Sequence, residues 1–253
     1  MRRLERLQAG VETLGAGNLS ARVQVEGRDE IARLAGSFNR AAARIEDLVG
    51  AHRMLLANAS HELRTPLSRI RLGIELLEET KDPKYKVAIE QDIAELDSMI
   101  DEILLASRLE ANRQPQIEEN IDLLALAAEE GARYDGCTVE GEAVTVAGER
   151  RLLGRLVRNL IENAVRHGKP PVRVEVRRDG NVAILEVMDA GAGVPEAERE
   201  RVFSPFHRLR RDSPGAGLGL ALVRQIARLH GGDAVVAPRR DHASCFRVSL
   251  PLP

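Results

Sequence analysis

Residues 60–67 read Ser-His-Glu-Leu-Arg-Thr-Pro-Leu, and they place a histidine, a carboxylate and a hydroxyl within about one helical turn. At about 100° per residue, the apolar residues around this octet fall on one stripe with spacings of three and four: Leu56, Ala59, Leu63, Leu67, Ile70, Ile74 and Leu77. His61 points almost directly away from that stripe, and Thr65 shares its exposed face one turn later. A histidine that satisfied a hydrophobic core would lie on the stripe, so the sequence predicts an exposed His61.

The residue types of the octet suit phosphoryl chemistry. A neutral imidazole carries one unprotonated nitrogen that can attack a phosphorus atom. Glu62 is placed to hold the other ring nitrogen or to accept its proton. Thr65 can position a water, and Pro66 removes a backbone donor and locally loosens or bends the helix. An isolated His-Glu pair is more simply a surface feature of an amphipathic helix, so it is the whole octet that favours a chemical role.

The octet resembles the phospho-acceptor motif of the sensor histidine kinases, the transmitter proteins of bacterial two-component systems. Four further motifs repeat the resemblance in the order in which that family carries them. The resemblance implies that His61 is phosphorylated and that Glu62 assists proton transfer. It also implies that Thr65 serves the dephosphorylation of a partner response regulator.

Composition narrows the remaining possibilities. The 253 residues include 37 Lys and Arg against 39 Asp and Glu, which leaves a formal charge of −2 and argues against a general nucleic-acid binder. Only 2% of the residues are aromatic and none is Trp, so base-stacking surfaces are not expected. Cys137 and Cys245 form neither a disulfide framework nor a metal-binding spacing. The sequence has no run of about 18 apolar residues and no signal peptide, which predicts a soluble piece.

The first 49 residues predict two helices joined by an extended connector. A short heptad-like seam over residues 4–14 ends in the turn-forming residues 15–18. Asp29-Glu30 opens the second helix, where acidic side chains suit the positive end of the helix dipole. The seam of that helix steps by three and four: Ile31, Leu34, Phe38, Ala41, Ile45 and Leu48.

This arrangement resembles a HAMP signalling module, in particular through Asp29-Glu30, Leu34 and Phe38-Asn39. The alternative is a plain dimeric coiled coil. In HAMP-bearing receptors the module usually follows a membrane span, and the basic start Met1-Arg2-Arg3 fits a position just inside a membrane. The resemblance therefore implies a preceding sensor and transmembrane region that this sequence lacks. It implies that the chain is the cytoplasmic portion of an inner-membrane sensor.

The octet lies in a predicted helical hairpin over residues 50–113. Residues 80–84 form the turn, and the returning helix carries one apolar face: Ile89, Ile93, Leu96, Ile100, Ile103 and Leu104. One hairpin cannot bury such a stripe well by itself, whereas two hairpins related by a twofold axis make a four-helix bundle. The sequence therefore predicts a homodimer. A monomeric helix pair covered by the next domain is the weaker alternative.

The helical pattern stops around residues 112–115, and from Ile121 onward helices and strands alternate. Helices are predicted over 121–132, 149–167 and 218–230, and strands over 137–146, 172–177, 182–188, 234–237 and 244–250. Asp179-Gly180-Asn181 predicts a hairpin turn between two of those strands. The pattern indicates an α+β sandwich over residues 118–253, with helices on one face of a mixed sheet.

Asn159, Asn163, Arg166 and His167 share one predicted helix at spacings of three to four. An amide oxygen can ligate Mg²⁺, and basic residues a turn later can meet phosphates. Taken alone, an Asn-rich amphipathic helix is more often structural. Here it resembles the N box of the kinases, which implies a magnesium ligand at Asn163.

Asp189-Ala190-Gly191-Ala192-Gly193 directly follows a predicted strand, and its glycines allow backbone to approach a ligand closely. A buried carboxylate at Asp189 can accept a hydrogen bond from the exocyclic amine of adenine, which would select ATP over GTP. By itself this pattern is often just a turn. It matches the first glycine box of the family, although the family commonly has Asn where Ala190 stands, which puts a secondary polar contact in doubt.

Two more motifs follow. Phe203-Ser204-Pro205-Phe206 resembles the F box, whose aromatic residues pack beneath a mobile lid over the nucleotide. The second glycine box, with Gly215, Gly217, Leu218 and Gly219, opens a helix whose N-terminal amides can bind phosphate. Between these boxes, basic side chains are candidates to neutralise phosphates during transfer: Arg208, Arg210 and Arg211.

Together these features predict an ATP-dependent and Mg²⁺-dependent protein histidine kinase (EC 2.7.13.3). His61 would attack the γ-phosphorus, and the phosphoryl group would pass to an aspartate on the receiver domain of a response regulator. Thr65 predicts the reverse, phosphatase, activity as well. A gyrase-type or Hsp90-type ATPase is a second reading, but those proteins lack the octet. A dimeric signalling scaffold that no longer transfers phosphate is the third.

Overall fold

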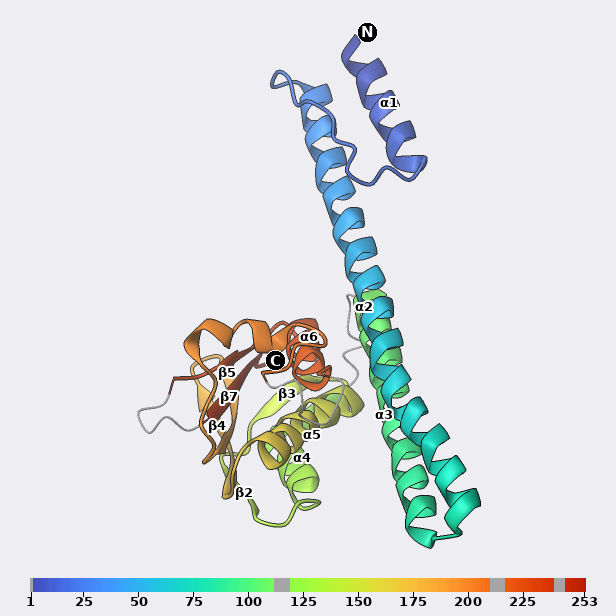
Figure 1. Cartoon of the computed structure of the whole chain (residues 1–253). Coiled ribbons are helices and arrows are strands. Elements are labelled where there is room, and N and C mark those ends of the chain that lie inside the picture. The colour runs from blue at the N-terminus through green and yellow to red at the C-terminus, as the bar shows by residue number, and fades with distance from the viewer. Residues whose placement is uncertain (1, 112–118, 210–216, 239–243) are drawn as a thin grey trace. The chain divides into compact units, whose positions relative to one another are not determined.

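The computed structural model describes residues 2–111, 119–209, 217–238 and 244–253 (Figure 1). The chain divides into two compact units, residues 1–60 and 61–253. Among the described residues, no helix is both long and apolar enough to cross a membrane.

The first unit contains α1 (Arg2–Gly15) and the beginning of α2 (Glu30–Thr80), joined by an extended connector. Val23 of the connector is buried with Leu7 and Ala35, and Phe38 packs against this cluster. Asn39 holds the connector in place, because its amide accepts from the N–H of Val23 at 2.9 Å and donates to the carbonyl of the same residue at 2.8 Å. The two predicted helices and the extended connector are thus present.

The start of α2 follows from the acidic pair predicted to open it. The carboxylate of Asp29 accepts a hydrogen bond from the N–H of Ala32 at 3.0 Å, as an N-capping residue does. Arg3 of α1 pairs with the same carboxylate at 2.8 Å. The backbone N–H of Ala32 and the charge of Arg3 together lower the pKa of the Asp29 carboxyl.

The second unit begins with a helical hairpin of α2 and α3 (Pro83–Ala111). The α2 helix continues through Pro66 to Thr80, and the side chain of Asp82 accepts from the N–H of Lys84 at 3.0 Å at the turn. The two helices approach closely at Gly73, where a Cβ atom would lie 2.8 Å from Cγ1 of Ile89. The hairpin therefore forms where the sequence predicts it.

The apolar stripe of this hairpin is only partly covered within one chain. Met99 and Ala106 of α3 are buried. Leu67, in contrast, is 53% exposed. Further large apolar side chains of the two helices are exposed as well: Ile74, Ile93, Ile100 and Leu104.

The rest of the second unit is an α+β domain. Its helices are α4 (Leu123–Gly131), α5 (Arg150–His167) and α6 (Gly219–Leu229), with two short 3₁₀ helices, η1 (Glu196–Glu198) and η2 (Arg201–Phe203). Its strands are β1 (Glu119–Asp122), β2 (Cys137–Gly141), β3 (Thr145–Gly148), β4 (Val172–Asp179), β5 (Val182–Asp189), β6 (Asp233–Val236) and β7 (Ser244–Pro251).

Five strands form a mixed sheet in the order β2-β4-β5-β7-β6. The pair β2–β4 is parallel, and the other pairs are antiparallel. Along β4, Val172, Val174 and Val176 are buried while their neighbours are not, so one face of this strand is apolar. Helices α4, α5 and α6 contact the sheet, and their buried residues complete the hydrophobic core of the domain. Leu156, Leu160 and Ile226 of these helices are fully buried. The predicted α+β sandwich is confirmed.

Two sequence predictions in this domain are wrong in detail. The helix predicted from Ile121 begins at Leu123, because residues 119–122 form β1 and pair with β3, with Ile121 opposite Val146. Asp122 then caps α4 by accepting from the N–H of Ala125 at 3.0 Å. The single strand predicted over 137–146 is two strands in two different sheets.

The break between those two strands has a steric cause. Gly141 ends β2 with a φ of +137°, and a Cβ atom there would lie 1.9 Å from the carbonyl oxygen of Val176. Only glycine fits this backbone contact, and the chain leaves the sheet at that residue. By contrast, the predicted β4–β5 hairpin and the stop of α6 are confirmed, with Gly180 and Gly231 at positive φ.

Candidate active site

A cavity of about 1450 Å³ opens in the second unit beside α5, the residues after β5 and the start of α6. Its lining includes most of the residues predicted from the nucleotide motifs: Asn159, Asn163, Arg166, His167, Asp189, Gly191, Gly193, Arg208, Gly217 and Gly219. These motifs are separated in sequence by tens of residues, and the fold brings them to one cavity. The predicted Gly215, Arg210 and Arg211 lie outside the described residues.

Asp189 ends β5 and is only 4% exposed, although it lines the cavity. Its Oδ1 atom accepts a hydrogen bond from the N–H of Gly191 at 2.7 Å. A buried carboxylate needs such partners, because an unpaired charge in a protein interior is costly. The bond orients the carboxylate at the wall of the cavity, where a ligand amine could reach it.

Gly168 is a site residue that sequence reasoning missed. It follows the last residue of α5, and a Cβ atom there would lie 2.3 Å from Cγ of Asp189 and 2.5 Å from the carbonyl oxygen of Ala164. Gly191 is equally close, since its Cβ would lie 2.6 Å from Oδ1 of Asp189. A glycine after a helix reads as an ordinary helix stop, so the sequence gives no signal for this contact.

The two asparagines of α5 have different surroundings. Asn159 is 4% exposed, and its amide nitrogen donates to the carbonyl of Gly219 at 3.2 Å. Asn163 is half-buried and presents an amide to the cavity. Glu162 beside it also lines the cavity and was not predicted. Tyr134 holds Glu162 with a hydrogen bond of 2.9 Å, and burial together with this bond raises the pKa of Tyr134 to about 12.

The oxygen atoms of Asn163 and Glu162 suit a Mg²⁺ ion, which prefers a few protein oxygens and takes its other ligands from waters and phosphates. Among the described residues, no cluster of three or more His, Cys, Asp or Glu side chains forms a metal cage. This donor set fits an ion carried in with a nucleotide better than a permanent metal site.

Basic side chains gather at the C-terminal end of α5. Arg166 and His167 are exposed there, and Arg208 lines the same cavity. Partial burial lowers the pKa of His167, and the positive charges of Arg166 and Arg208 lower it further. The charges of Arg166 and Arg208 therefore create a positive region that would attract phosphate oxygens, whereas the lowered pKa favours the neutral form of His167 beside them.

Three residues predicted to bind the nucleotide do not line the cavity. Phe203 is buried, with its ring perpendicular to that of Phe246 at a centroid distance of 6.3 Å. Phe206 has a φ of +62°, and its N–H donates to the carbonyl of Gly217 at 3.0 Å. Leu218 is buried against Met99, with Phe206 packed against the same cluster. These three residues therefore pack outside the cavity lining and do not face the cavity itself.

The octet lies on α2 of the same unit. His61 and Thr65 are exposed, as the sequence predicts, and neither lines the cavity. Glu62 is half-buried, and its Oε2 atom lies 3.6 Å from Nη1 of Arg208. An ion pair thus links the carboxylate beside His61 to an arginine of the cavity wall.

Comparison with protein families divides the chain in the same order as the motifs. A HAMP domain matches residues 1–47, and a His Kinase A (phospho-acceptor) domain matches residues 51–112. Residues 148–253 match the histidine kinase-, DNA gyrase B- and HSP90-like ATPase family. His61 lies in the second of these matches, and most of the residues that line the cavity lie in the third.

Two sensor histidine kinases align with nearly the whole chain. The sensor histidine kinase GtrS of Pseudomonas aeruginosa is 34% identical over 259 residues, which cover 100% of this chain and 52% of GtrS. MtrB of Mycobacterium tuberculosis, also a sensor histidine kinase, is 33% identical over 270 residues, which cover 95% of this chain and 47% of MtrB. The chain therefore spans about half the length of these relatives.

Among solved structures, the histidine kinase ThkA in complex with the response regulator TrrA matches with a TM-score of 0.63 and 21% identity, over 86% of this chain and 66% of ThkA. At that identity the match supports the fold alone. The family matches, the relatives and the geometry of the cavity agree. The chain belongs to the sensor histidine kinases and carries their HAMP, phospho-acceptor and ATPase-type domains.

Proposed function

We propose that this chain is a protein histidine kinase that phosphorylates His61 from Mg·ATP and passes the phosphoryl group to an aspartate of a response regulator. One observation carries the proposal. A cavity lined by Asn163, Asp189 and two glycines of the second glycine box occurs in the same unit as an exposed His61, and Arg208 of that cavity pairs with the neighbouring Glu62.

The nucleotide would be held from both ends. Asp189 would accept a hydrogen bond from the exocyclic amine of adenine, which guanine cannot supply at that position. Arg166 and Arg208 would neutralise the phosphates, and the amide oxygen of Asn163 would hold a magnesium ion that balances their charge. The buried hydrogen bond of Asp189 to Gly191 supports the first role, because it keeps the carboxylate at the wall.

In the transfer step, a nitrogen of His61 attacks the γ-phosphorus. The nitrogen–phosphorus bond forms as the bond from phosphorus to the bridging oxygen breaks, and ADP leaves. Glu62 holds or receives the proton of the other ring nitrogen. Such a reaction depends mostly on positioning and charge stabilisation.

The ion pair between Glu62 and Arg208 bears on this step. An arginine that is paired with Glu62 neutralises less phosphate charge, and a Glu62 that is paired with an arginine is a weaker base. We propose that the pair opens when Mg·ATP binds and His61 approaches the phosphate, which requires a movement between the acceptor helix and the cavity.

After transfer, the phosphoryl group would pass to a receiver domain, and Thr65 would position a water for the reverse, phosphatase, reaction. The phospho-acceptor domain match and the sensor histidine kinase relatives support a partner of this kind. The exposed apolar side chains of α2 and α3 support a homodimer, since a second hairpin would cover them in a four-helix bundle.

For the chain as a whole we propose three domains: a HAMP module over residues 1–49, the dimerisation and phosphotransfer hairpin over 50–113, and the ATP-binding domain over 118–253. We also propose that the chain acts on the cytoplasmic side of a membrane as part of a sensor protein. The HAMP match and the named relatives support this location.

The proposal is tested by incubating the purified chain and its His61→Gln variant with Mg²⁺ and γ-labelled ATP. Acid-labile, alkali-stable label on the parent alone is the expected result. Label that survives in His61→Gln would refute the acceptor assignment. If the parent binds ATP and takes up no label, a signalling scaffold becomes the better description.

A further inference from the structure

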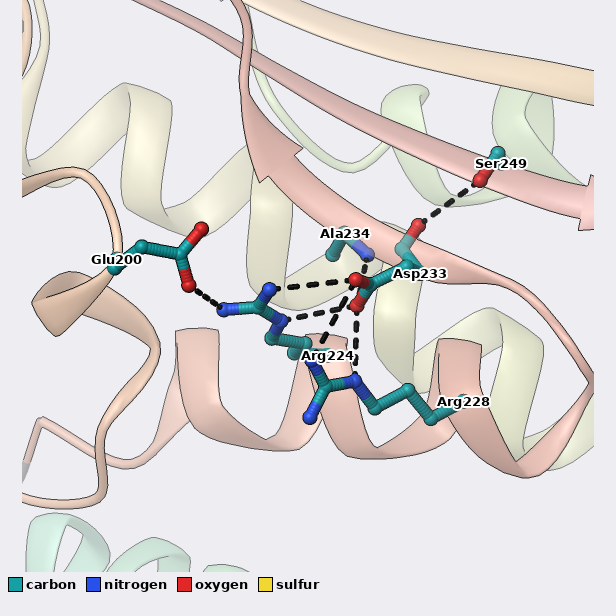
Figure 2. A network of polar contacts seen from close by, with 6 residues as sticks. All are labelled: Glu200, Arg224, Arg228, Asp233, Ala234 and Ser249. Carbon is teal, nitrogen blue, oxygen red and sulfur yellow. Dashed lines mark hydrogen bonds and ion pairs between the residues drawn. The ribbon is translucent and has the colours of Figure 1, made fainter.

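Arg224 lies in the middle of α6 and joins three segments of the ATPase domain (Figure 2). Its guanidinium donates to both carboxylate oxygens of Asp233, from Nε at 2.9 Å and from Nη2 at 3.3 Å. Its Nη1 atom donates to Glu200 at 2.6 Å. Only 15% of the side chain is exposed, so these contacts hold a largely buried cation.

The same guanidinium also lies over an aromatic ring. Its Cζ atom is 5.1 Å from the ring centroid of Phe203, within the range of a cation–π contact. Phe203 in turn packs edge to face on Phe246, which lines the nucleotide cavity. Arg224 therefore reaches the cavity wall through one intervening ring, although it does not line the cavity itself.

The positions of these partners in the chain indicate which elements Arg224 connects. Glu200 and Phe203 immediately precede residues 204–218, and α6 begins directly after them. That segment supplies several residues of the cavity wall, among them Arg208 and Gly217. Its two ends also meet in the hydrogen bond from Phe206 to Gly217. Arg224 thus connects the element before the segment to the element after it.

Asp233, at the start of β6, is the fixed end of this connection. Its burial would raise the pKa of its carboxyl, but the hydrogen bonds from Arg224, Arg228 and the N–H of Ala234 outweigh that effect and lower the pKa to about 2. The carboxylate is therefore charged at any pH at which the protein would work. The backbone carbonyl of Asp233 accepts a hydrogen bond from the hydroxyl of Ser249 in β7 at 3.4 Å (Figure 2). This bond connects Asp233 to the neighbouring strand of the five-stranded sheet.

Arg228 offers a natural comparison on the same helix. It donates to the same carboxylate, with Nε 3.0 Å from Oδ1 of Asp233, and 59% of its side chain is exposed. It is not the arginine that pairs with Glu200 or lies over Phe203. A substitution at Arg228 would remove charge and an Asp233 contact from α6 and leave the connection to the F box in place.

We propose that Arg224 is a positioning residue for nucleotide binding: it fixes Phe203 and Glu200 against α6 and thereby sets the separation of the two ends of the segment 204–218. This inference rests on the proposed nucleotide site. Loss of the connection would let the cavity wall at Phe246, Arg208 and Gly217 shift, and the displaced groups would bind the nucleotide less tightly. The acceptor chemistry at His61 would be unaffected once nucleotide is bound.

The test compares Arg224→Met, Arg224→Lys and Arg228→Met with the parent protein. Calorimetry gives the dissociation constant of Mg·ADP, and autophosphorylation at varied ATP gives KM and kcat separately. Hydrogen–deuterium exchange of the peptide that contains Phe206 reports on the two ends of the segment in the nucleotide-free protein. The thermal midpoint of each variant reports on the fold.

We expect Arg224→Met to weaken Mg·ADP binding and raise the KM for ATP by about tenfold or more, with kcat within about twofold. The Phe206 amide should exchange faster, and exchange in β4 and β5 should not change. Arg224→Lys, which keeps a cation near Phe203, should recover part of the affinity. Arg228→Met should stay within about twofold of the parent in every binding readout.

The inference is overturned if Arg224→Met lowers the thermal midpoint while its nucleotide affinity and Phe206 exchange match those of Arg228→Met. If Arg224→Met does not fold, Arg224→Lys decides the question, since parent-like affinity and exchange in that variant would overturn the inference. A parent protein that binds no Mg·ADP would instead refute the proposed function, and with it the inference.

Discussion

The side-chain amide of Asn159 donates a hydrogen bond to the backbone carbonyl of Gly219 at 3.2 Å. The two residues are 60 positions apart, one on α5 and the other at the first residue of α6. The bond fixes the start of α6 against the helix that carries Asn163. The helix of the predicted magnesium ligand and the helix opened by the second glycine box are thus joined directly.

Asn159→Ala should lower both stability and nucleotide affinity. Removing the amide takes this donor away from the Gly219 carbonyl, and the loss of one such hydrogen bond costs about 0.5–1.5 kcal/mol. Denaturant unfolding and Mg·ADP calorimetry would measure the two effects. Asn120→Ala, at an exposed position of β1, is the control and should change neither. Unchanged affinity in Asn159→Ala would mean that the bond does not position the site.

Gly168→Ala should damage adenine binding in particular. The new Cβ would collide with the Asp189 carboxylate and with the carbonyl of Ala164, so the carboxylate must turn or shift. A misplaced polar group at a binding site loses about tenfold or more in affinity, because the buried group is then left unpaired. The preference for ATP over GTP, measured by competition, should shrink. Gly15→Ala is the matched control, since nothing lies within 4 Å of a Cβ at that position.

Glu62→Gln should slow autophosphorylation by about a hundredfold or more, the usual contribution of a positioned general base. The affinity for Mg·ADP should stay within about twofold of the parent value, since Glu62 does not line the cavity. Single-turnover labelling and calorimetry separate the two quantities. A variant that loses binding and transfer equally would show that the pair with Arg208 shapes the nucleotide site instead.

The lowered pKa of Asp233 predicts that the folded protein loses stability at acid pH. The pKa of its carboxyl is about 2 in the folded protein, against an ordinary value of 3.8, so the folded state binds its proton less readily than the unfolded state. The resulting stabilisation is complete above the ordinary pKa and is lost as the pH falls through about 2. Urea unfolding at several pH values below 5 should therefore show a shallower loss in Asp233→Asn, which is already less stable at neutral pH. Asp101→Asn, on an exposed part of α3, should keep the slope of the parent.

Leu104→Glu combined with Ile100→Glu should convert a dimer into a monomer. Both apolar side chains are exposed on α3, and a carboxylate there could not be buried against a second hairpin without a large desolvation cost. Sedimentation velocity at several concentrations would follow the change. Lys86→Glu, which alters the charge of the same helix at a largely exposed side chain, should leave the dimer intact. A parent protein that sediments as a monomer would contradict the predicted bundle.

Local sequence determined a large part of this protein. The octet identified an exposed histidine on a helix, and helical periodicity gave α2, α3, α5 and α6 close to their observed ends. The roles of Asp29 and Gly180 could be predicted, because helix capping and tight turns depend on residues a few places away along the chain. The spacing of Asn159 and Asn163, and the glycines after β5, pointed to the cavity for the same reason.

What the sequence could not decide depends on partners far along the chain. Residues 119–122 form a strand because β3 lies beside them, and Gly141 ends β2 because the carbonyl of Val176 occupies the space of a side chain. Gly168 is required by Asp189, and Arg224 acquires its partners only when α6 packs beside η2 and β6. Periodicity and motifs report local preference, whereas close packing and buried ion pairs arise between segments that only the folded chain brings together.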